Sequence, residues 1–246
     1  MGDVALPADD LVLEKMLRSS KFGPPMPYES TPWDFAHSWG DAVLRTRVWP
    51  IVSRLFVDED EMVRARCAEL ARVWNDSSDV TLPRLIEVAE KHGDLYADQR
   101  PEGCTLRSEL AFALCNRSNP ELGPRVAKVL EEMVLHEALG GGAAIVIARH
   151  DPGFVAAHAK VWGDARQSWF AEAASAVALY RRDELLGFLH ELRVLGAEAR
   201  AEVLARAESY LEPDDTKATA IATSQKLPPP TKPAPTADEC RRALAL

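Results

Sequence analysis

The sequence predicts an all-α protein built from antiparallel helix pairs. From Trp33 onward, apolar residues recur with a period close to that of an amphipathic helix. The sequence contains no run of alternating β-branched residues of the kind that forms a strand. Short polar or Gly/Pro breaks separate the helical stretches, so successive helices must lie antiparallel, either in a compact bundle or as stacked pairs.

Residues 1–32 are expected to form one short helix followed by an extended connector. Leucines recur at helical spacing over residues 10–20, and either Asp9 or Asp10 can cap the start of this helix. Four prolines in the second half of the region exclude helix and strand interiors. The main helical body is therefore assigned to residues 33–212.

The body is expected to consist of helices joined by short connections. These connections hold residues that commonly stop or start helices, such as Asp58, Pro120 and Gly153. The predicted helices are 34–47, 49–57, 60–75, 81–92, 104–117, 121–136, 138–149, 153–161, 165–181, 183–194 and 197–211.

Two stretches of the body repeat each other at an offset of 43 residues. Residues 63–71 (VRARCAELA) align with residues 106–114 (LRSELAFAL), and each stretch follows a shorter predicted helix. An offset of this size lies within the period of helix-pair repeats. The repetition favours stacked pairs over a compact bundle.

The stretch 49–75 combines an apolar first helix, an acidic turn with the spacing D-x-D-x-x-V-R, and a second helix with small residues. The residues in this pattern are Asp58, Asp60, Val63, Arg64 and Ala68. The unit resembles the HEAT repeat, and the resemblance extends by helix length over about 34–211. It implies a right-handed α-α superhelix of HEAT-like helix pairs.

The motif residues are expected to act in stability. Asp58 and Asp60 can accept hydrogen bonds from free backbone N–H groups at the start of a helix and favour the positive end of its dipole. The resemblance implies that Arg64 reaches the acidic residue of a neighbouring repeat.

The C-terminal tail differs from the body in composition. Residues 213–235 have low apolar content and end in a segment with five prolines over 228–235, which predicts a disordered, polyproline-like linker. Residues 236–246 are expected to form a short helix capped by Thr236 or Asp238. We expect this helix to dock on a partner or in the molecule's own groove.

The charge balance argues against nucleic acid and anionic membranes as partners. The chain has 29 Lys and Arg against 38 Asp and Glu, for a formal net charge of −9, which repels phosphate groups. No secretory signal or membrane-spanning segment is visible. The four cysteines show no C-x-x-C spacing, so they are expected to be reduced thiols in a cytoplasmic protein.

No complete catalytic or metal-binding motif is present. His136-Glu137 lacks the second histidine of a zinc-protease helix, and Gly140–Gly142 lacks the lysine and hydroxyl residue of a phosphate loop. His150-Asp151 lacks further ligands for a metal. We therefore expect no catalytic residue, no cofactor and no metal site.

The leading functional hypothesis is a non-enzymatic protein-binding module with an acidic helical-repeat surface, such as a scaffold, an adaptor or an immunity-type inhibitor of a basic toxin. The alternative is a HEAT-like enzyme, similar to DNA-alkylation glycosylases or bilin lyases. The tryptophans either cap the helical stack or anchor a partner, and the oligomeric state stays open. Candidate partner contacts are Trp33, Trp39, Trp74, Trp162, Trp169, Leu244 and Leu246.

Overall fold

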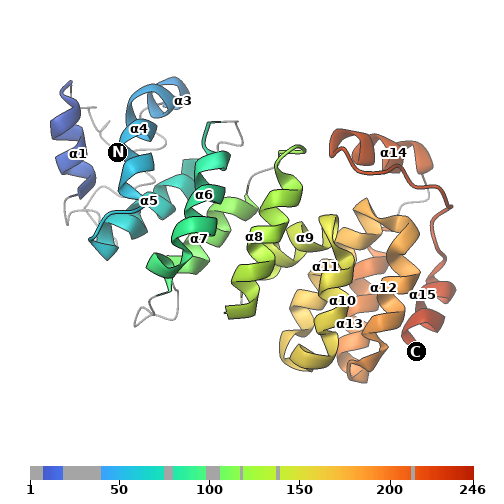
Figure 1. Ribbon diagram of the computed structural model, residues 1–246. Coiled ribbons are helices and arrows are strands. Elements are labelled where there is room, and N and C mark those ends of the chain that lie inside the picture. The colour runs from blue at the N-terminus through green and yellow to red at the C-terminus, as the bar shows by residue number, and fades with distance from the viewer. Residues whose placement is uncertain are drawn as a thin grey trace, which may run out of the picture. The chain divides into compact units, whose positions relative to one another are not determined.

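The all-α prediction is confirmed for the residues that the computed structural model describes, which are helical and contain no strand. The chain divides into two compact units, residues 1–118 and 119–246, which are treated separately below (Figure 1). Trp33 and Trp39 lie outside the described residues, and so does the Pro-rich connector before them. The described ranges are 8–18, 40–74, 80–97, 106–116, 119–136, 139–211 and 214–246.

Unit 1 is a set of packed helices in which α4 contacts α5, α6 contacts α7, and α5 contacts α7. The N-terminal helix α1 also packs on α5. The elements are α1 (Asp10–Arg18), α3 (Gly40–Val43), the π-helical turn η2 (Leu44–Val48), α4 (Trp49–Leu55), α5 (Glu61–Trp74), α6 (Leu82–His92), the 3-10 turn η3 (Gly93–Tyr96) and α7 (Leu106–Cys115).

The predicted N-terminal helix is confirmed as α1. The Asp9 carboxylate accepts a hydrogen bond from the backbone N–H of Leu11 at 2.8 Å, so Asp9 caps the helix. Leu13 and Leu17 are buried. Arg18 at the end of α1 pairs with Asp58 of the acidic turn.

The predicted helix break at Val48 is wrong. Residues 40–55 are helical throughout, and the backbone N–H of Trp49 bonds to the carbonyl of Leu44 within the π-helical turn. Pro50 follows at the start of α4. Because proline has no N–H to donate, the local widening to a π turn lets the helix continue where a break was expected.

The acidic turn starts α5 as the motif predicted. Asp58 accepts from the backbone N–H of Asp60 at 3.0 Å, and Asp60 accepts from that of Met62 at 2.8 Å. Val63 and Ala68 are buried. Asp60 therefore caps α5, which begins at Glu61, while the bond to Asp58 lies in the turn before the helix.

The contact implied for Arg64 is wrong in its chemistry. The buried guanidinium donates to the backbone carbonyls of Asp58 at 2.7 Å, Glu59 at 3.1 Å and Leu95 at 3.1 Å, and no carboxylate bonds it among the described residues. Leu95 belongs to the turn after the next helix, so Arg64 does connect successive helix pairs. Carbonyls that would otherwise be unsatisfied take the place of the expected acidic side chain.

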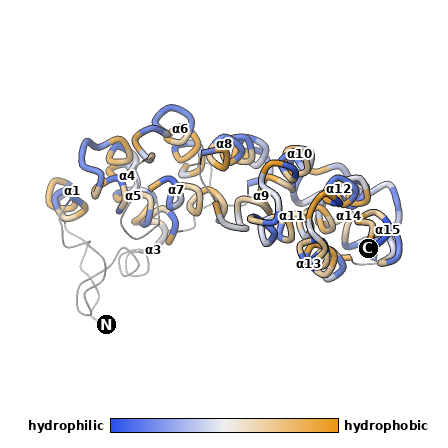
Figure 2. The backbone as a smooth tube through the Cα atoms, turned by 90° about the horizontal axis from the view of Figure 1, so that it is seen from below, coloured by the Kyte–Doolittle hydropathy of each residue, from blue (hydrophilic) through white to orange (hydrophobic). Residues whose placement is uncertain are grey.

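Unit 2 packs its helices in two alternating sets. Helix α11 contacts α9 and α13, while α12 contacts α10 and α15. In Figure 2 these helices carry both hydrophobic and hydrophilic residues, as amphipathic helices do. The elements are α8 (Gly123–His136), α9 (Gly141–His150), α10 (Pro152–Trp162), η4 (Gly163–Arg166), α11 (Gln167–Tyr180), η5 (Arg182–Glu184), α12 (Leu185–Glu191), η6 (Leu192–Val194), α13 (Ala197–Glu208), α14 (Asp215–Ser224) and α15 (Ala237–Leu244).

The interpretation of residues 213–235 as a disordered linker is wrong for 215–224, which form α14. The Asp214 carboxylate caps this helix by accepting from the backbone N–H of Thr216 at 2.9 Å. Ala218 and Ala222, one helical turn apart, are buried, and α14 packs on α11. The segment has few large apolar residues, and packing of small ones is what stabilises it.

The predicted C-terminal helix is confirmed as α15. Thr236 caps it, and a reciprocal pair of hydrogen bonds with Glu239 forms a capping box. Cys240 and Leu244 lie on one face and are fully buried. The helix docks on α12, α13 and η6 of its own chain.

Replacing Gly196 by alanine is expected to destabilise unit 2. Its backbone N–H donates to the Asp164 carboxylate at 2.8 Å, and an added Cβ would clash with that same carboxylate. We expect Gly196→Ala to lower the free energy of unfolding by about 1–3 kcal/mol, measured by chemical denaturation.

The matched control is Gly187→Ala within α12, where an added Cβ meets nothing within 4 Å. Removing a glycine from a helix interior is expected to raise the free energy of unfolding by about 0.5–1 kcal/mol. Equal effects of the two substitutions would contradict the proposed clash.

Candidate functional site

The predicted partner contacts fall into three structural classes. Trp74 packs against the Trp49 ring, with centroids 5.6 Å apart, inside unit 1. Trp169 and Leu244 are buried within unit 2, so neither side chain is exposed on the surface of this chain. Trp162 is half-buried, and Leu246 is 49% exposed.

Trp162 belongs to a continuous stack along one face of α10, which we call the α10 ladder (Phe154, His158, Trp162 and Arg166). The ring centroids of Phe154 and His158 are 4.4 Å apart, and those of His158 and Trp162 are 4.5 Å apart. The Arg166 guanidinium lies 4.4 Å from the Trp162 centroid. The i, i+4, i+8 spacing places the three rings on the same face of the helix.

The first residues of α11 pack against one side of the α10 ladder. Trp169 meets Trp162 edge to face, with centroids 5.1 Å apart, and Phe170 lies beside both. His158 Nδ1 lies 2.8 Å from the carbonyl oxygen of Phe154, which fixes the orientation of its ring. One side of the ladder is therefore packed against α11.

Two buried donor atoms of this cluster have no hydrogen-bond partner among the described residues. They are Nη1 of Arg166 and Nε1 of Trp169. Burial lowers the pKa of the Arg166 guanidinium below its ordinary value. The arginine is thus a partly desolvated cation held by an aromatic face.

An apolar edge adjoins the α10 ladder. Val161 is 77% exposed on α10, and Val194 is 46% exposed on η6, which contacts α10. Exposed apolar side chains close to aromatic rings are typical of protein-binding surfaces. We take this surface as the candidate partner interface.

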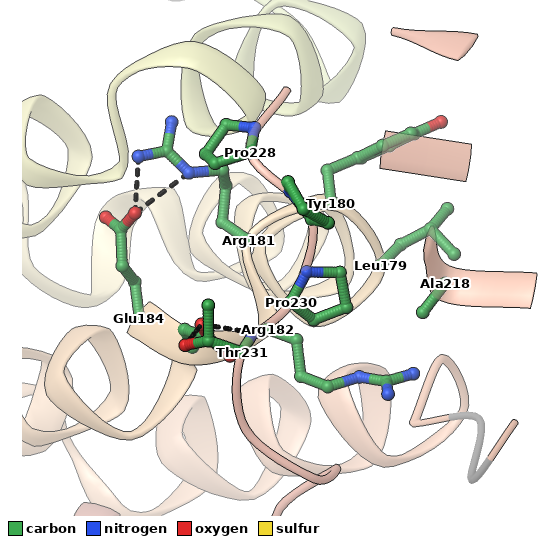
Figure 3. Close-up of a pocket in the computed structure, with 11 residues that line it drawn as sticks. Leu179, Tyr180, Arg181, Arg182, Glu184, Ala218, Pro228, Pro230 and Thr231 are labelled. Carbon is green, nitrogen blue, oxygen red and sulfur yellow. Dashed lines mark hydrogen bonds and ion pairs between the residues drawn. The ribbon is translucent and has the colours of Figure 1, made fainter. Parts of the chain in front are cut away.

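A second feature is a pocket of about 120 Å³ at the opposite end of α11 (Figure 3). The turn from α11 to α12 forms one wall, and the Pro-rich segment forms the other. The lining residues are Leu179, Tyr180, Arg181, Arg182, Asp183, Glu184, Ala218, Pro228, Pro229, Pro230 and Thr231.

The charged groups of this pocket are engaged in contacts within unit 2. Arg181 pairs with Glu184, as Figure 3 shows, and also donates to the carbonyl of His150 at 3.1 Å. Arg182 is buried and pairs with Asp215 of α14 at 2.7 Å. The charged side chains of the pocket therefore bond to other groups of unit 2, and the Arg182–Asp215 pair attaches α14 to the turn after α11.

Asp183 holds the Pro-rich segment by three hydrogen bonds. Its carboxylate accepts from the backbone N–H of Thr231 at 2.7 Å, from the Thr231 hydroxyl, and from the backbone N–H of Lys232 at 3.0 Å. Burial alone would raise the pKa of this carboxyl, but the bonds from Thr231 and Lys232 outweigh it and hold the pKa below its ordinary value. We call this contact the Asp183 latch.

His150, at the end of α9, is surrounded by cationic groups. Burial, together with the positive charges of Arg149 and Arg181, lowers its pKa to about 4. Arg149 itself stacks on the Tyr180 ring at 4.2 Å. The imidazole is therefore neutral at physiological pH.

Comparison with protein-family models, with curated proteins and with solved structures finds no match for this chain. Within the described ranges, no group of three or more His, Cys, Asp and Glu side chains is placed to hold a metal ion. Among those same residues we find no helix whose length and apolar character would let it cross a bilayer.

The sequence analysis named Trp162 as a candidate contact but did not name the aromatic residues that stack with it. Phe154 and His158 precede it by eight and four residues, a spacing that was visible in the sequence. No sequence pattern predicted the Asp183 latch, because Asp183 and Thr231 are 48 residues apart.

Removing the Asp183 carboxylate is expected to release the Pro-rich segment. Asp183→Ala loses three hydrogen bonds, so we expect the free energy of unfolding to fall by about 1–2 kcal/mol and the amides of Thr231 and Lys232 to exchange faster. Glu184→Gln is the control, because an exposed ion pair contributes less than about 1 kcal/mol. Unchanged amide exchange in Asp183→Ala would contradict the latch.

The low pKa of His150 predicts an acid-sensitive stability. Between pH 6.5 and about 4 the unfolded chain binds a proton at this histidine and the folded chain does not, so stability falls as the pH falls through that window. His150→Gln is expected to flatten this part of the stability profile, measured by urea unfolding across pH. A wild-type profile in His150→Gln would refute the assignment.

Proposed function

We propose that this chain is a non-enzymatic protein-binding module and that its partner is a basic protein. The observation that carries the proposal is the apolar edge beside the α10 ladder, where Val161 is 77% exposed next to the half-buried Trp162. Tryptophan and arginine are the residue types enriched among interface hot spots, and the ladder stacks one on the other.

Rigidity of the α10 ladder favours binding. Trp162 is stacked on His158, covered by Arg166 and supported by Trp169, so few rotamers remain to be lost when a partner contacts it. Immobilised side chains commonly cost about 0.5–1.5 kcal/mol each on association. A surface that is already ordered avoids much of that cost.

The net charge supports a basic partner. At −9 the chain attracts cationic proteins over the range of the Debye length. Such attraction mainly raises the association rate, while the apolar edge sets the residence time. The association rate is therefore expected to fall as salt increases.

The alternating packing supports a finer description of the fold. In unit 2, α9, α11 and α13 follow one another in one set, and α10, α12 and α15 in the other, as in stacked helix pairs. We include in the proposal that the pairs form a HEAT-like right-handed superhelix. The free thiols of Cys67, Cys115 and Cys240 suit a reducing compartment such as the cytoplasm.

The interface proposal predicts that Val161→Asp weakens partner binding. A carboxylate at this exposed position leaves the fold intact but adds a desolvation cost within the proposed interface. We expect the affinity for a captured basic protein to fall at least about tenfold, which corresponds to 1.4 kcal/mol, measured by titration calorimetry.

Leu135→Asp is the matched control, since Leu135 is 51% exposed on α8, a helix that contributes no residue to the ladder. It should bind the partner like wild type. Equal losses in both variants would contradict the interface. Salt-resistant binding to duplex DNA would favour the glycosylase-like alternative instead.

A further inference from the structure

The start of α11 carries positive charge that its own residues do not balance. This helix is 14 residues long, its N-cap residue Arg166 makes no side-chain cap hydrogen bond, and its first turn contains no acidic residue. The backbone N–H groups at a helix start favour a negative charge. Asp164, two residues before Arg166, bonds instead to the backbone N–H of Gly196 at 2.8 Å.

Arg166 is a cation without a counter-charge among the residues that the structure describes. Its Nη1 is buried and has no hydrogen-bond partner there. Burial lowers the pKa of the guanidinium, and no carboxylate of the described ranges acts in the opposite direction. A cation in this state is costly to the fold unless an anion reaches it.

Trp169 supplies a second unsatisfied donor at the same place. Its side chain is 3% exposed, and its Nε1 has no acceptor within the described part of the chain. Side chains in a helix lean back towards the N-terminus, which for Trp169 is the position of Arg166. Both side chains contact the Trp162 ring, whose centroid lies 4.4 Å from the guanidinium carbon and 5.1 Å from the Trp169 centroid. Two buried donors on one ring therefore lack an acceptor.

A carboxylate matches this pair of donors. It carries one negative charge for the one guanidinium, and it has two oxygens, one for each donor. Hydrogen bonds between a guanidinium and a carboxylate are charge-assisted and stronger than neutral ones. The indole N–H donates without adding charge.

We propose that Arg166 and Trp169 form a binding site for a carboxylate at the N-terminus of α11. Arg166 is half-buried, so a shift of its side chain along the Trp162 face admits the ligand. The bound carboxylate then lies in surroundings of low dielectric constant, where its attraction to the cation is strengthened. The site uses neither Val161 nor Val194, and it stands whether or not a basic protein binds beside it.

The test is a titration of the full, ¹⁵N-labelled chain with sodium acetate at constant ionic strength, balanced with sodium chloride. The readout is the indole N–H signal of Trp169 in NMR spectra, assigned by triple-resonance experiments. We expect a saturable downfield shift with a millimolar Kd, because a new hydrogen bond deshields the proton and acetate has few atoms with which to bind.

Arg166→Gln removes the charge and keeps much of the side-chain volume, so the Kd for acetate should rise at least about tenfold. Arg242→Gln is the matched control, because it removes the same charge from an exposed position on α15. It should leave the Kd unchanged. Circular dichroism checks that both variants stay helical, and the wild-type titration decides the question without any variant.

A capped peptide with a single glutamate, titrated in the same way, separates the two sources of a carboxylate. A lower Kd for the peptide than for acetate assigns the site to an acidic side chain of a protein, and an equal or higher Kd assigns it to a small free acid. Either result supports the site. A Trp169 signal that moves with neither probe overturns the proposal, and it is the result expected if a buried water satisfies the two donors. A shift with an unchanged Kd in Arg166→Gln overturns it as well.

Discussion

The close approach of α11 to its two neighbours is the constraint on which unit 2 depends. Its buried positions are mostly alanines, and α11 contacts both α9 and α13. The distance between packed helices is set by the side chains at their contact, so small residues let one helix serve two partners. The alanines in question are Ala171, Ala173, Ala174, Ala176 and Ala178.

The α10 ladder and the pocket at the tail both depend on α11, because each is built against one end of this helix. At its first turn, Trp169 supports the α10 ladder from below. At its last turn, Tyr180 and the following charged residues form the pocket that fastens the tail (Figure 3). A helix stack also needs its end covered, and α14 and α15 supply that cover by packing on α11, α12 and α13.

Local chemistry made much of the fold predictable. The helix starts capped by Asp60 and by Thr236 depend on residues two or three positions apart, and both caps are present in the structure. The helix α14 was missed because its packing face consists of Ala218 and Ala222, which give no amphipathic signal. Periodicity detects large apolar residues and is blind to small ones.

Contacts between distant residues were beyond sequence reasoning. Arg64 was expected to bond to a carboxylate. Its buried guanidinium instead donates to the backbone carbonyls of Leu95 and Asp58. Trp162 and Trp169 looked alike in the sequence, but one is half-buried and the other buried. Which of two neighbouring aromatic rings faces solvent depends on the helices packed around them.

The most direct test of the role of α11 is hydrogen exchange on Ala174→Leu, with the exposed Ala201→Leu on α13 as control. Ala174 is fully buried, so a larger side chain must push the neighbouring helices apart. The account predicts faster amide exchange in α9 and α13, and in Thr231 and Lys232 at the Asp183 latch. Faster exchange confined to α11, with α9, α13 and the latch unchanged, would contradict it.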